Sequence, residues 1–281
     1  MRVVVTGAAG QVGRELVEVC DAHGDDVSAF THATLDVTDA VAVSDTVAGC
    51  RPDAVVHCAA WTAVDACESD PARADLVNAT GTGHVAAAAR DANAYLVVLS
   101  TDYVFDGTKP KPYVETDTPN PASVYGRSKW GAEQAVEGDA AIMRISWVCG
   151  RYGNNMVKTL IRLAADGVDP QFVDDQVGHP TIVGDLVPMI RDFVLDRRPG
   201  LFHVTNQGAV SWFEFAQEVF EAAGADRARV SPIATAQLDP PRPAPRPANS
   251  VLDNAALRAA GLPLLPDHRD SVARLVRQLT A

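Results

Sequence analysis

Three glycines that directly follow the first apolar run constrain this chain more than any other feature. The run Val3–Val5 leads into Gly7, Gly10 and Gly13, and a helical stretch begins at Gln11. Glycines at this spacing allow a tight turn, close packing of helix against strand, and a close approach of the backbone to a pyrophosphate. The helix N-terminus then turns free N–H groups and a partial positive charge toward the phosphates. A tight turn without a ligand is the alternative, but the strand–turn–helix context favours a dinucleotide-binding turn.

Strand-like apolar runs alternate with helical stretches through the first half of the chain. Units of this length predict an α/β fold with a Rossmann-like, doubly wound parallel sheet, in which right-handed crossovers place helices on both faces. The strands expected are Val3–Val5, Val27–Phe30, Ala54–His57, Leu96–Ser100 and Ala141–Ile145. The helices expected are, notably, Gln11–Ala22, Pro71–Arg90 and Ala122–Glu137.

The second half of the chain is less regular and predicts a smaller α+β domain that would bind the substrate. Ser211 and Glu214 have the spacing of a capping box, so we expect a helix to start after Ser211 and to run to Ala223. The proline-rich segment 240–247 is expected to be a rigid surface loop, with a polyproline ligand for another protein as the alternative. The other elements expected are a strand at Leu201–Thr205 and helices at Asn154–Ala165, Val183–Leu195 and Arg269–Leu279.

The balance of charge argues against a polyanionic partner. The chain has 36 Asp and Glu against 24 Lys and Arg, a net charge of −12, so no binding to nucleic acid is expected. No apolar run approaches the ~18–20 residues that span a bilayer, and the glycines follow the first apolar run too soon for a signal peptide. We therefore expect a cytoplasmic protein that does not contact a membrane.

Cysteine spacing argues against a disulfide framework and against zinc. The five cysteines, at positions 20, 50, 58, 67 and 149, are odd in number and form no CxxC pair. No metal ligand is predicted from them.

Aspartate and arginine dominate the charged residues, and lysine occurs only at positions 109, 111, 129 and 158. Such a surface suits a salty cytosol, where screening relieves self-repulsion between the acids. We therefore expect a halophilic protein. Codon usage rich in G and C is the alternative, because it also favours arginine over lysine.

The end of the second strand should distinguish NAD from NADP, because an acid there binds the ribose 2′-hydroxyl and a base suits a 2′-phosphate. The residues there are Thr31 and His32, with neither a clear acid nor an arginine. We expect NADP(H) to be preferred, with use of NAD(H) possible. We expect Asp36 and Val37 to contact the adenine. The alternative is that this region only forms the start of a helix, at Thr38 or Asp39. The small residues of Ala59–Trp61 suit a close approach of the cofactor.

Tyr125 and Lys129 form a Y-x-x-x-K pair on one face of an expected helix. An ammonium near a phenol favours the phenolate and lowers a pKa that starts near ~10. A general acid or base that acts on a carbonyl or alcohol needs this property. The pair follows Ser100 and Thr101, at the edge where open α/β sheets bind ligands, so Thr101 can hydrogen-bond the reacting oxygen. Ordinary strand termination is the alternative for Ser100 and Thr101.

These motifs resemble those of the extended short-chain dehydrogenase/reductases, and within them the dTDP-4-dehydrorhamnose reductase family. STDYVF together with VYGxxK is specific to this branch. The resemblance implies transfer of hydride from NAD(P)H to the C4 ketone of a nucleotide-activated deoxy sugar, dTDP-4-dehydro-L-rhamnose first among them. The matching stretches are TGAAGQVGRE at 6–15, RPDAVVHCAAWTAVDACES at 51–69, LSTDYVFDG at 99–107, VYGRSK at 124–129, RISWVCG at 144–150, GNNMVKTLIRLA at 153–164 and DDQVGHPT at 174–181.

The resemblance implies a catalytic set of Thr101, Tyr125 and Lys129. Tyr125 would donate a proton to the C4 keto oxygen, Lys129 would hold the nicotinamide ribose and tune Tyr125, and Thr101 would orient the carbonyl. Trp147 matches a sugar-contacting position, with core packing as the alternative. The substrate contacts expected are Val64, Thr101, Asp102, Tyr125 and Trp147. The cofactor contacts expected, including those of the glycine turn, are Gly7, Gly10, Gln11, Val12, Gly13, Thr31, His32, Asp36, Val37, Ala59, Ala60, Trp61 and Lys129.

Some bacterial members of the family bind Mg²⁺ at a dimer interface through acidic residues. Glu15 matches one such position, but the register near Gly184 and Asp185 leaves its partner unassigned. Glu15 also lies in a first helical turn, where a carboxylate is favourable in any case. We therefore predict no metal ligands, and we leave Mg²⁺ and a homodimer open.

We assign residues 1–148 plus about 173–205 to the NAD(P)-binding domain, and about 149–172 plus 206–281 to the sugar-nucleotide-binding domain. Two other functions stay open. A sugar-nucleotide dehydratase or epimerase shares the fold, but similar dehydratases place an acid where this chain has Tyr103. The other is a non-catalytic NADP-binding subunit similar to the regulatory subunit of methionine adenosyltransferase, which would bind NADP(H) without consuming it.

Overall fold

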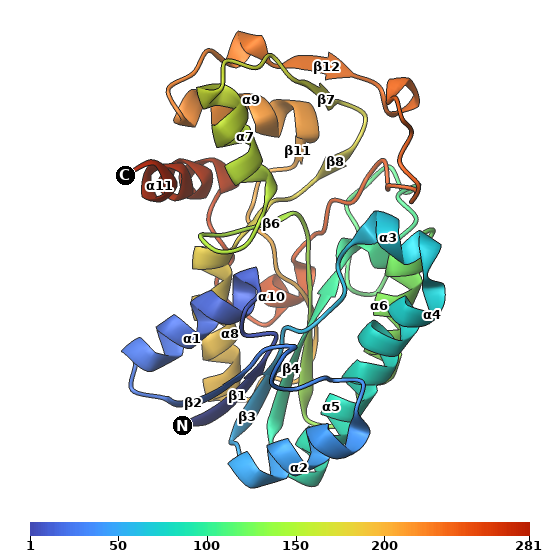
Figure 1. Cartoon of the computed structure of the whole chain (residues 1–281), viewed down its shortest axis with the longest axis vertical. Helices are drawn as coiled ribbons and strands as arrows, with labels where there is room; N and C mark the ends of the chain where they lie inside the picture. Colours follow the sequence, from blue (N-terminus) through green and yellow to red (C-terminus); the bar gives the residue numbers. More distant parts are fainter.

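The computed structural model describes all 281 residues, and a six-stranded sheet lies at its centre (Figure 1). Every pair of neighbouring strands is parallel. The predicted fold class is confirmed, and all six strands fall on predicted runs. In order across the sheet they are β10 (Gly200–His203), β5 (Ala140–Ile145), β4 (Tyr95–Thr101), β3 (Ala54–His57), β1 (Arg2–Thr6) and β2 (Asp26–Phe30).

The connections reverse direction next to β1. The chain leaves β1 for β2 at one edge of the sheet, and it then crosses back to β3 on the other side of β1. Open α/β sheets bind ligands where the connections diverge in this way, at the carboxyl ends of the strands. The topology therefore places a binding crevice between the ends of β1 and β3.

Helices cover both faces of the sheet, because its central strands are apolar on both sides. All four residues of β3 are buried, as are six of the seven of β4. In Figure 1, α1 (Gln11–Ala22) and α8 (Val183–Asp196) lie against one face of the sheet. The helices α2 (Ala40–Cys50) and α5 (Gly81–Asp91) lie against the opposite face.

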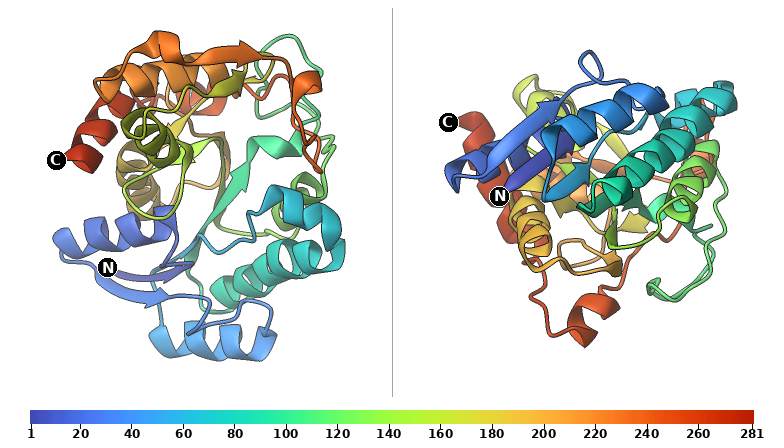
Figure 2. Two further views of the ribbon diagram at one scale, coloured as in Figure 1. Left: turned by 45° about the horizontal axis from the view of Figure 1, so that its top comes forward. Right: turned by 90° about the horizontal axis from the view of Figure 1, so that it is seen from below.

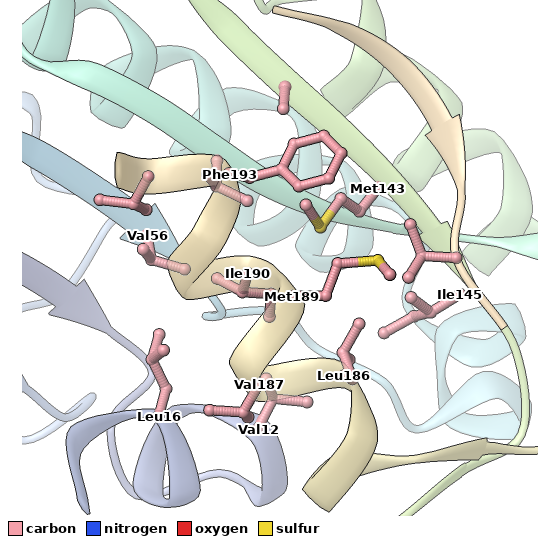
Figure 3. Close-up of a cluster of buried hydrophobic side chains, with 14 of the residues drawn as sticks. Val12, Leu16, Val56, Met143, Ile145, Leu186, Val187, Met189, Ile190 and Phe193 are labelled. Atoms are coloured by element: carbon pink, nitrogen blue, oxygen red, sulfur yellow. The ribbon is translucent and has the colours of Figure 1, made fainter. Parts of the chain in front are cut away.

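The core between α1, α8 and the sheet is shown in Figure 3. Leu16 of α1, Ile190 of α8 and Met143 of β5 are each fully buried there. Leu257 and Leu265, far along the chain, pack into the same core. Their packing associates residues around 257–265 with the sheet, whereas the domain division proposed above places that segment with the second domain.

The predicted helix Pro71–Arg90 is interrupted by a π-helical turn. The amide of Asn78, inside this turn, accepts a hydrogen bond from the Trp61 N–H at 2.7 Å and donates to Ser128 Oγ at 2.9 Å. Such turns are frequent at functional sites. Here the turn places the Asn78 side chain so that it bonds both Trp61 and Ser128. The pieces are α4 (Pro71–Ala74), η1 (Asp75–Thr80) and α5.

Side-chain caps set where the later helices begin. Ser211 and Glu214 form the predicted capping box, and Ser123 accepts a hydrogen bond from the Gly126 N–H at 3.0 Å. The ends of the observed helices lie within three residues of the predicted ones, and part of the difference arises because the capping residues themselves lie outside the helix. They are α6 (Val124–Gln134), α7 (Met156–Ala165), α9 (Trp212–Ala222) and α11 (His268–Thr280).

A second apolar core lies beyond the carboxyl edge of the sheet, where α7, α9 and α11 pack together (Figure 2). Leu160, Phe215, Phe220 and Leu275 are buried in it. Three two-stranded sheets border this core. They are β7 (Gln171–Val173) with β12 (Ser231–Ile233), β8 (Val177–Gly178) with β11 (Val210–Ser211), and β6 (Val148–Cys149) with β9 (Thr181–Ile182).

None of the helices combines the length and the apolar character that a membrane span needs. Short elements complete the chain. The proline-rich segment 240–247 forms a loop anchored to α3, because Arg246 makes two hydrogen bonds, of 2.5 and 2.8 Å, to the carboxylate of Asp65. The remaining elements are α3 (Val64–Ser69), α10 (Ala255–Ala259), η2 (Asp102–Val104), η3 (Arg227–Arg229) and η4 (Thr235–Gln237).

Candidate active site

Two cavities open at the carboxyl edge of the sheet, one of about 520 Å³ and one of about 320 Å³. Both are lined by Gly10, Cys58, Ala59 and Ala60, so they form one groove around the end of β3. The groove lies at the crevice that the topology predicts, and it extends toward the second core, since Trp212 also lines the larger cavity.

The glycine turn has the geometry that a backbone needs to approach a ligand closely. Gly7 has φ +68°, and a Cβ atom there would lie 2.6 Å from the Ala59 nitrogen. A Cβ atom at Gly13 would lie 2.4 Å from the Gly7 carbonyl oxygen. Both glycines are therefore required by the turn itself, whereas Gly10 (φ −75°) has ordinary backbone geometry and faces the groove.

The smaller cavity collects the residues expected around the adenosine half of a dinucleotide. Gly7, His32, Asp36, Val37 and Trp61 line it. The backbone and hydroxyl of Thr38 donate to Asp36, and these bonds hold the pKa of Asp36 below its usual range. Thr31, which was expected here too, lines neither cavity and hydrogen-bonds Thr34 instead.

Arg73 is a cavity residue that the sequence did not reveal. It extends from α4, and its guanidinium carbon lies 4.5 Å from the centre of the Trp61 ring, over the face of the indole. Together with His32 it supplies the basic side chains of the smaller cavity. A lone arginine in a surface helix carries no sequence signal that would place it against this groove.

The larger cavity brings together the predicted catalytic residues. Thr101 ends β4, and Tyr125 and Lys129 lie one turn apart on α6, so all three line the same space. The Lys129 ammonium donates a hydrogen bond of 2.8 Å to the Leu99 carbonyl. Gly10, Gln11, Val12 and Gly13 of the glycine turn line this cavity as well, whereas Gly7 lines the smaller one.

Burial controls the titration of the Y-x-x-x-K pair. It lowers the pKa of Lys129 to about 8, an effect that the carboxylate of Glu133 opposes. It raises the pKa of Tyr125 above its ordinary value, and the neighbouring Thr101 side chain opposes this shift. The expectation that Lys129 lowers the pKa of Tyr125 below its ordinary value is therefore wrong for the protein alone. Tyr125 is a protonated phenol near neutral pH, ready to donate.

Two tryptophans form an aromatic wall of the larger cavity. Trp147 and Trp212 stack with ring centres 3.7 Å apart and planes at 12°. Trp147 has φ +44°, a strained conformation for a bulky residue, and such strain gathers at functional sites. A Cβ atom at Gly178 would lie 2.7 Å from the Trp147 ring, so a glycine is needed behind it. Val64 and Trp147, both predicted, line this cavity, but Trp212 was missed.

Glu15, which matches a Mg²⁺ position of the family, and the nearby Asp185 each face a basic side chain of the same chain. Glu15 Oε1 lies 3.4 Å from Arg151 Nε. Asp185 pairs with Arg274 and accepts a hydrogen bond of 2.8 Å from Asn206. No group of three or more His, Cys, Asp or Glu side chains is arranged to hold a metal ion. Glu15 Oε2 is buried without a hydrogen-bond partner, so this carboxylate is only partly paired within the chain.

The profile of one family, described as the RmlD substrate binding domain, matches residues 1–281. The chain belongs to this family. The dTDP-4-dehydrorhamnose reductase of Streptomyces griseus is 44% identical over 93% of this chain and 88% of its own. The dTDP-4-keto-6-deoxy-D-glucose reductase of Streptomyces niveus is 40% identical over 93% of this chain and 91% of its own.

Solved structures of the family share the whole architecture. The crystal structure of dTDP-4-dehydrorhamnose reductase from Bacillus anthracis, in complex with NADP, has a TM-score of 0.94 and 38% identity. It covers 99% of both chains. The resemblance drawn from the sequence motifs is thus confirmed at the level of the family.

Proposed function

We propose that this protein is a reductase that transfers hydride from NADPH to the C4 ketone of a nucleotide-activated 6-deoxy sugar, with dTDP-4-dehydro-L-rhamnose as the first candidate. The observation that carries the proposal is the convergence of Thr101, Tyr125 and Lys129 on the cavity that the glycine turn also lines. The relatives named as reductases of dTDP-linked 4-keto sugars support the substrate class.

In this reaction NADPH supplies the hydride, and the chain supplies the proton and the orientation. The C4 carbon gains the hydride while its oxygen takes the proton of the Tyr125 hydroxyl, which leaves an alcohol on the sugar. Lys129 holds the cofactor ribose and stabilises the phenolate that Tyr125 becomes. The hydroxyl of Thr101 orients the carbonyl by turning its proton from Asp102 to the keto oxygen.

The groove fits a dinucleotide along its length. Gly10, Gln11 and Val12 present the start of α1 to the pyrophosphate, and free N–H groups there favour an anion. His32 and Arg73 make the adenosine end basic, which favours the 2′-phosphate of NADPH over the bare hydroxyl of NADH. The NADP in the related Bacillus anthracis structure supports the same preference.

The sugar nucleotide is placed in the larger cavity, between Val64 and the stacked Trp147 and Trp212. Aromatic faces suit the apolar face of a deoxy sugar or a nucleotide base.

The proposal also includes a homodimer, which light scattering tests, and a cytoplasmic location, which cell fractionation tests.

The decisive experiment is to assay NADPH and NADH oxidation against a panel of nucleotide-linked 4-keto sugars. Reduction of dTDP-4-dehydro-L-rhamnose, lost in Lys129→Met together with NADPH affinity, is the expected outcome. NADPH binding without consumption of any panel member would instead favour a regulatory subunit. Loss of water from a 4-hydroxy sugar would favour a dehydratase, against which Tyr103 in the cavity wall already argues.

A further inference from the structure

A carboxylate outside the cavity ties the two elements that carry the proposed catalytic residues, β4 and α6, to each other and to β5. Glu133 Oε1 accepts hydrogen bonds from Ser100 Oγ at 2.5 Å and from Arg144 Nε at 2.9 Å. Its Oε2 accepts from Arg144 Nη2 at 2.6 Å. The side chains of Glu133 and Arg144 are 3% and 1% exposed, so this ion pair is removed from water. It connects α6 with β4 and β5.

Each residue of this hydrogen-bonded group lies next to a residue of the site, in the chain, in the sheet or on the same helix face. Ser100 directly precedes Thr101, and Arg144 lies opposite Ser100 in the β4–β5 register. Glu133 follows Lys129 by four residues, on the same face of α6. The carboxylate therefore holds the end of the strand that presents Thr101 against the helix that presents Lys129.

Glu133 supplies negative charge that acts on Lys129, although its carboxylate also pairs with Arg144. Burial lowers the pKa of His57 to about 3 and raises that of Cys58 to about 12, so both are neutral near pH 7. Tyr125, on the same helix, is also neutral there. The carboxylate of Glu133 raises the pKa of Lys129 against the effect of burial.

We propose that Glu133 is a positioning residue for the reduction: it fixes Lys129 relative to Thr101 and supplies the charge that keeps the buried ammonium protonated. The inference rests on the proposed function for the use made of Lys129. Stability alone explains the ion pair less well, because replacing a buried pair by apolar groups of similar volume is often neutral or stabilising.

The charge on Lys129 can be read directly, without substrate or turnover. The chain has only four lysines, so ¹³C-labelled lysine gives four Cε signals, and Lys129→Met identifies the one of interest. In Glu133→Gln the titration of Lys129 is expected to move to lower pH by on the order of one unit. Glu137→Gln is the matched control. It removes one carboxylate from the exposed segment just after α6, where Glu137 lies 3.6 Å from Arg90, and should leave Lys129 unchanged.

A double variant guards against loss of folding. Glu133→Gln leaves Arg144 buried without a counter-charge, whereas Glu133→Leu with Arg144→Met removes both charges at similar volume. Lys129 should still titrate at lower pH in the double variant, and Glu133→Asp should restore part of the shift. The alkaline limb of the kcat/KM profile should move with the NMR titration.

An unchanged Lys129 titration in the double variant, or in folded Glu133→Gln, overturns the inference. The two proposals fail separately. If no 4-keto sugar is reduced but the Lys129 titration moves as expected, the proposed function falls and the charge effect of Glu133 stands.

Discussion

The Thr101 hydroxyl donates a hydrogen bond of 2.9 Å to Oδ1 of Asp102, while Oδ2 of the same carboxylate is buried without a partner. Burial raises the pKa of Asp102 to about 6, although its hydrogen bonds oppose the shift. Near neutral pH the wall of the larger cavity therefore holds an ionised carboxylate that orders the Thr101 hydroxyl and is poorly solvated.

Replacing Asp102 by asparagine should stabilise the protein at neutral pH. The folded-state pKa is raised, so the stability that protonated Asp102 contributes is fully present below about pH 4 and is lost as pH rises through about 6. The neutral asparagine avoids that loss. The advantage of Asp102→Asn, measured by urea unfolding, should thus grow between pH 4 and pH 7, to at most about 3 kcal/mol. Stability curves that stay parallel would contradict the prediction.

Tyr125→Phe removes the phenolic proton and keeps the ring. If Tyr125 is the general acid, single-turnover reduction of the 4-keto sugar should fall by roughly 10²–10⁴-fold. The affinity for NADPH, followed by cofactor fluorescence, should stay near that of the wild type, because our proposal assigns the ribose contact to Lys129 and not to Tyr125. Thr101→Val should cost less, since Thr101 supplies no proton. Wild-type turnover in Tyr125→Phe would require another donor.

Gly10→Val should abolish cofactor binding and leave the fold largely intact, because Gly10 has ordinary backbone geometry and its Cβ would meet the Gly7 carbonyl at 3.1 Å, a much milder contact than at Gly13. Gly13→Ala should instead destabilise the fold, since its Cβ would meet the Gly7 carbonyl at 2.4 Å. NADPH titration and thermal melting separate the two effects. Gly49→Ala is a control, because no atom lies within 4 Å of the added Cβ. Unaltered NADPH affinity in Gly10→Val would refute the assigned turn.

Trp212→Leu should raise KM for the sugar nucleotide by roughly 2- to 10-fold, the size of a lost aromatic contact. The Kd for NADPH should not change, because Trp212 lines only the larger cavity. Trp61→Leu should instead raise the Kd for NADPH and leave the KM for the sugar nucleotide unchanged, because Trp61 lines only the smaller cavity. Equal effects of the two substitutions on both ligands would show that the cavities do not divide the ligands in this way.

Added salt should raise the melting temperature. The chain carries a net charge of −12, and the Debye length falls from ~30 Å at 0.01 M to ~3 Å at 1 M salt. Screening by KCl should therefore relieve repulsion among the surface aspartates. A melting temperature that is flat from low to molar KCl would leave codon usage as the explanation of the composition.

Local patterns in the sequence are enough to predict the strands of the sheet and the residues at the centre of the site. Apolar periodicity marks every strand of the sheet, and the glycine turn marks the crevice between β1 and β3. Tyr125 and Lys129 could be paired because a helix brings residues four apart to one face. In each of these cases the deciding interaction lies within a short stretch of chain.

Long-range packing decides the remainder. Trp212 reaches the cavity because α9 stacks it on Trp147, 65 positions earlier in the chain. The high pKa of Tyr125 follows from its burial, which the Y-x-x-x-K spacing does not contain. The π-helical turn at Asn78 depends on partners in Trp61 and Ser128, so helix periodicity alone did not predict it.

Because α7, α9 and α11 form a core of their own, substitutions there can be accepted independently of substitutions in the core of the sheet. The glycine turn packs against the core of the sheet through Val12, whereas Trp212 packs against the second core. Packing changes in that core can therefore reshape the pocket for another sugar while the glycine turn and the Tyr125–Lys129 pair keep their geometry. A lineage of such chains can diversify its carbohydrate products without having to reinvent the reduction.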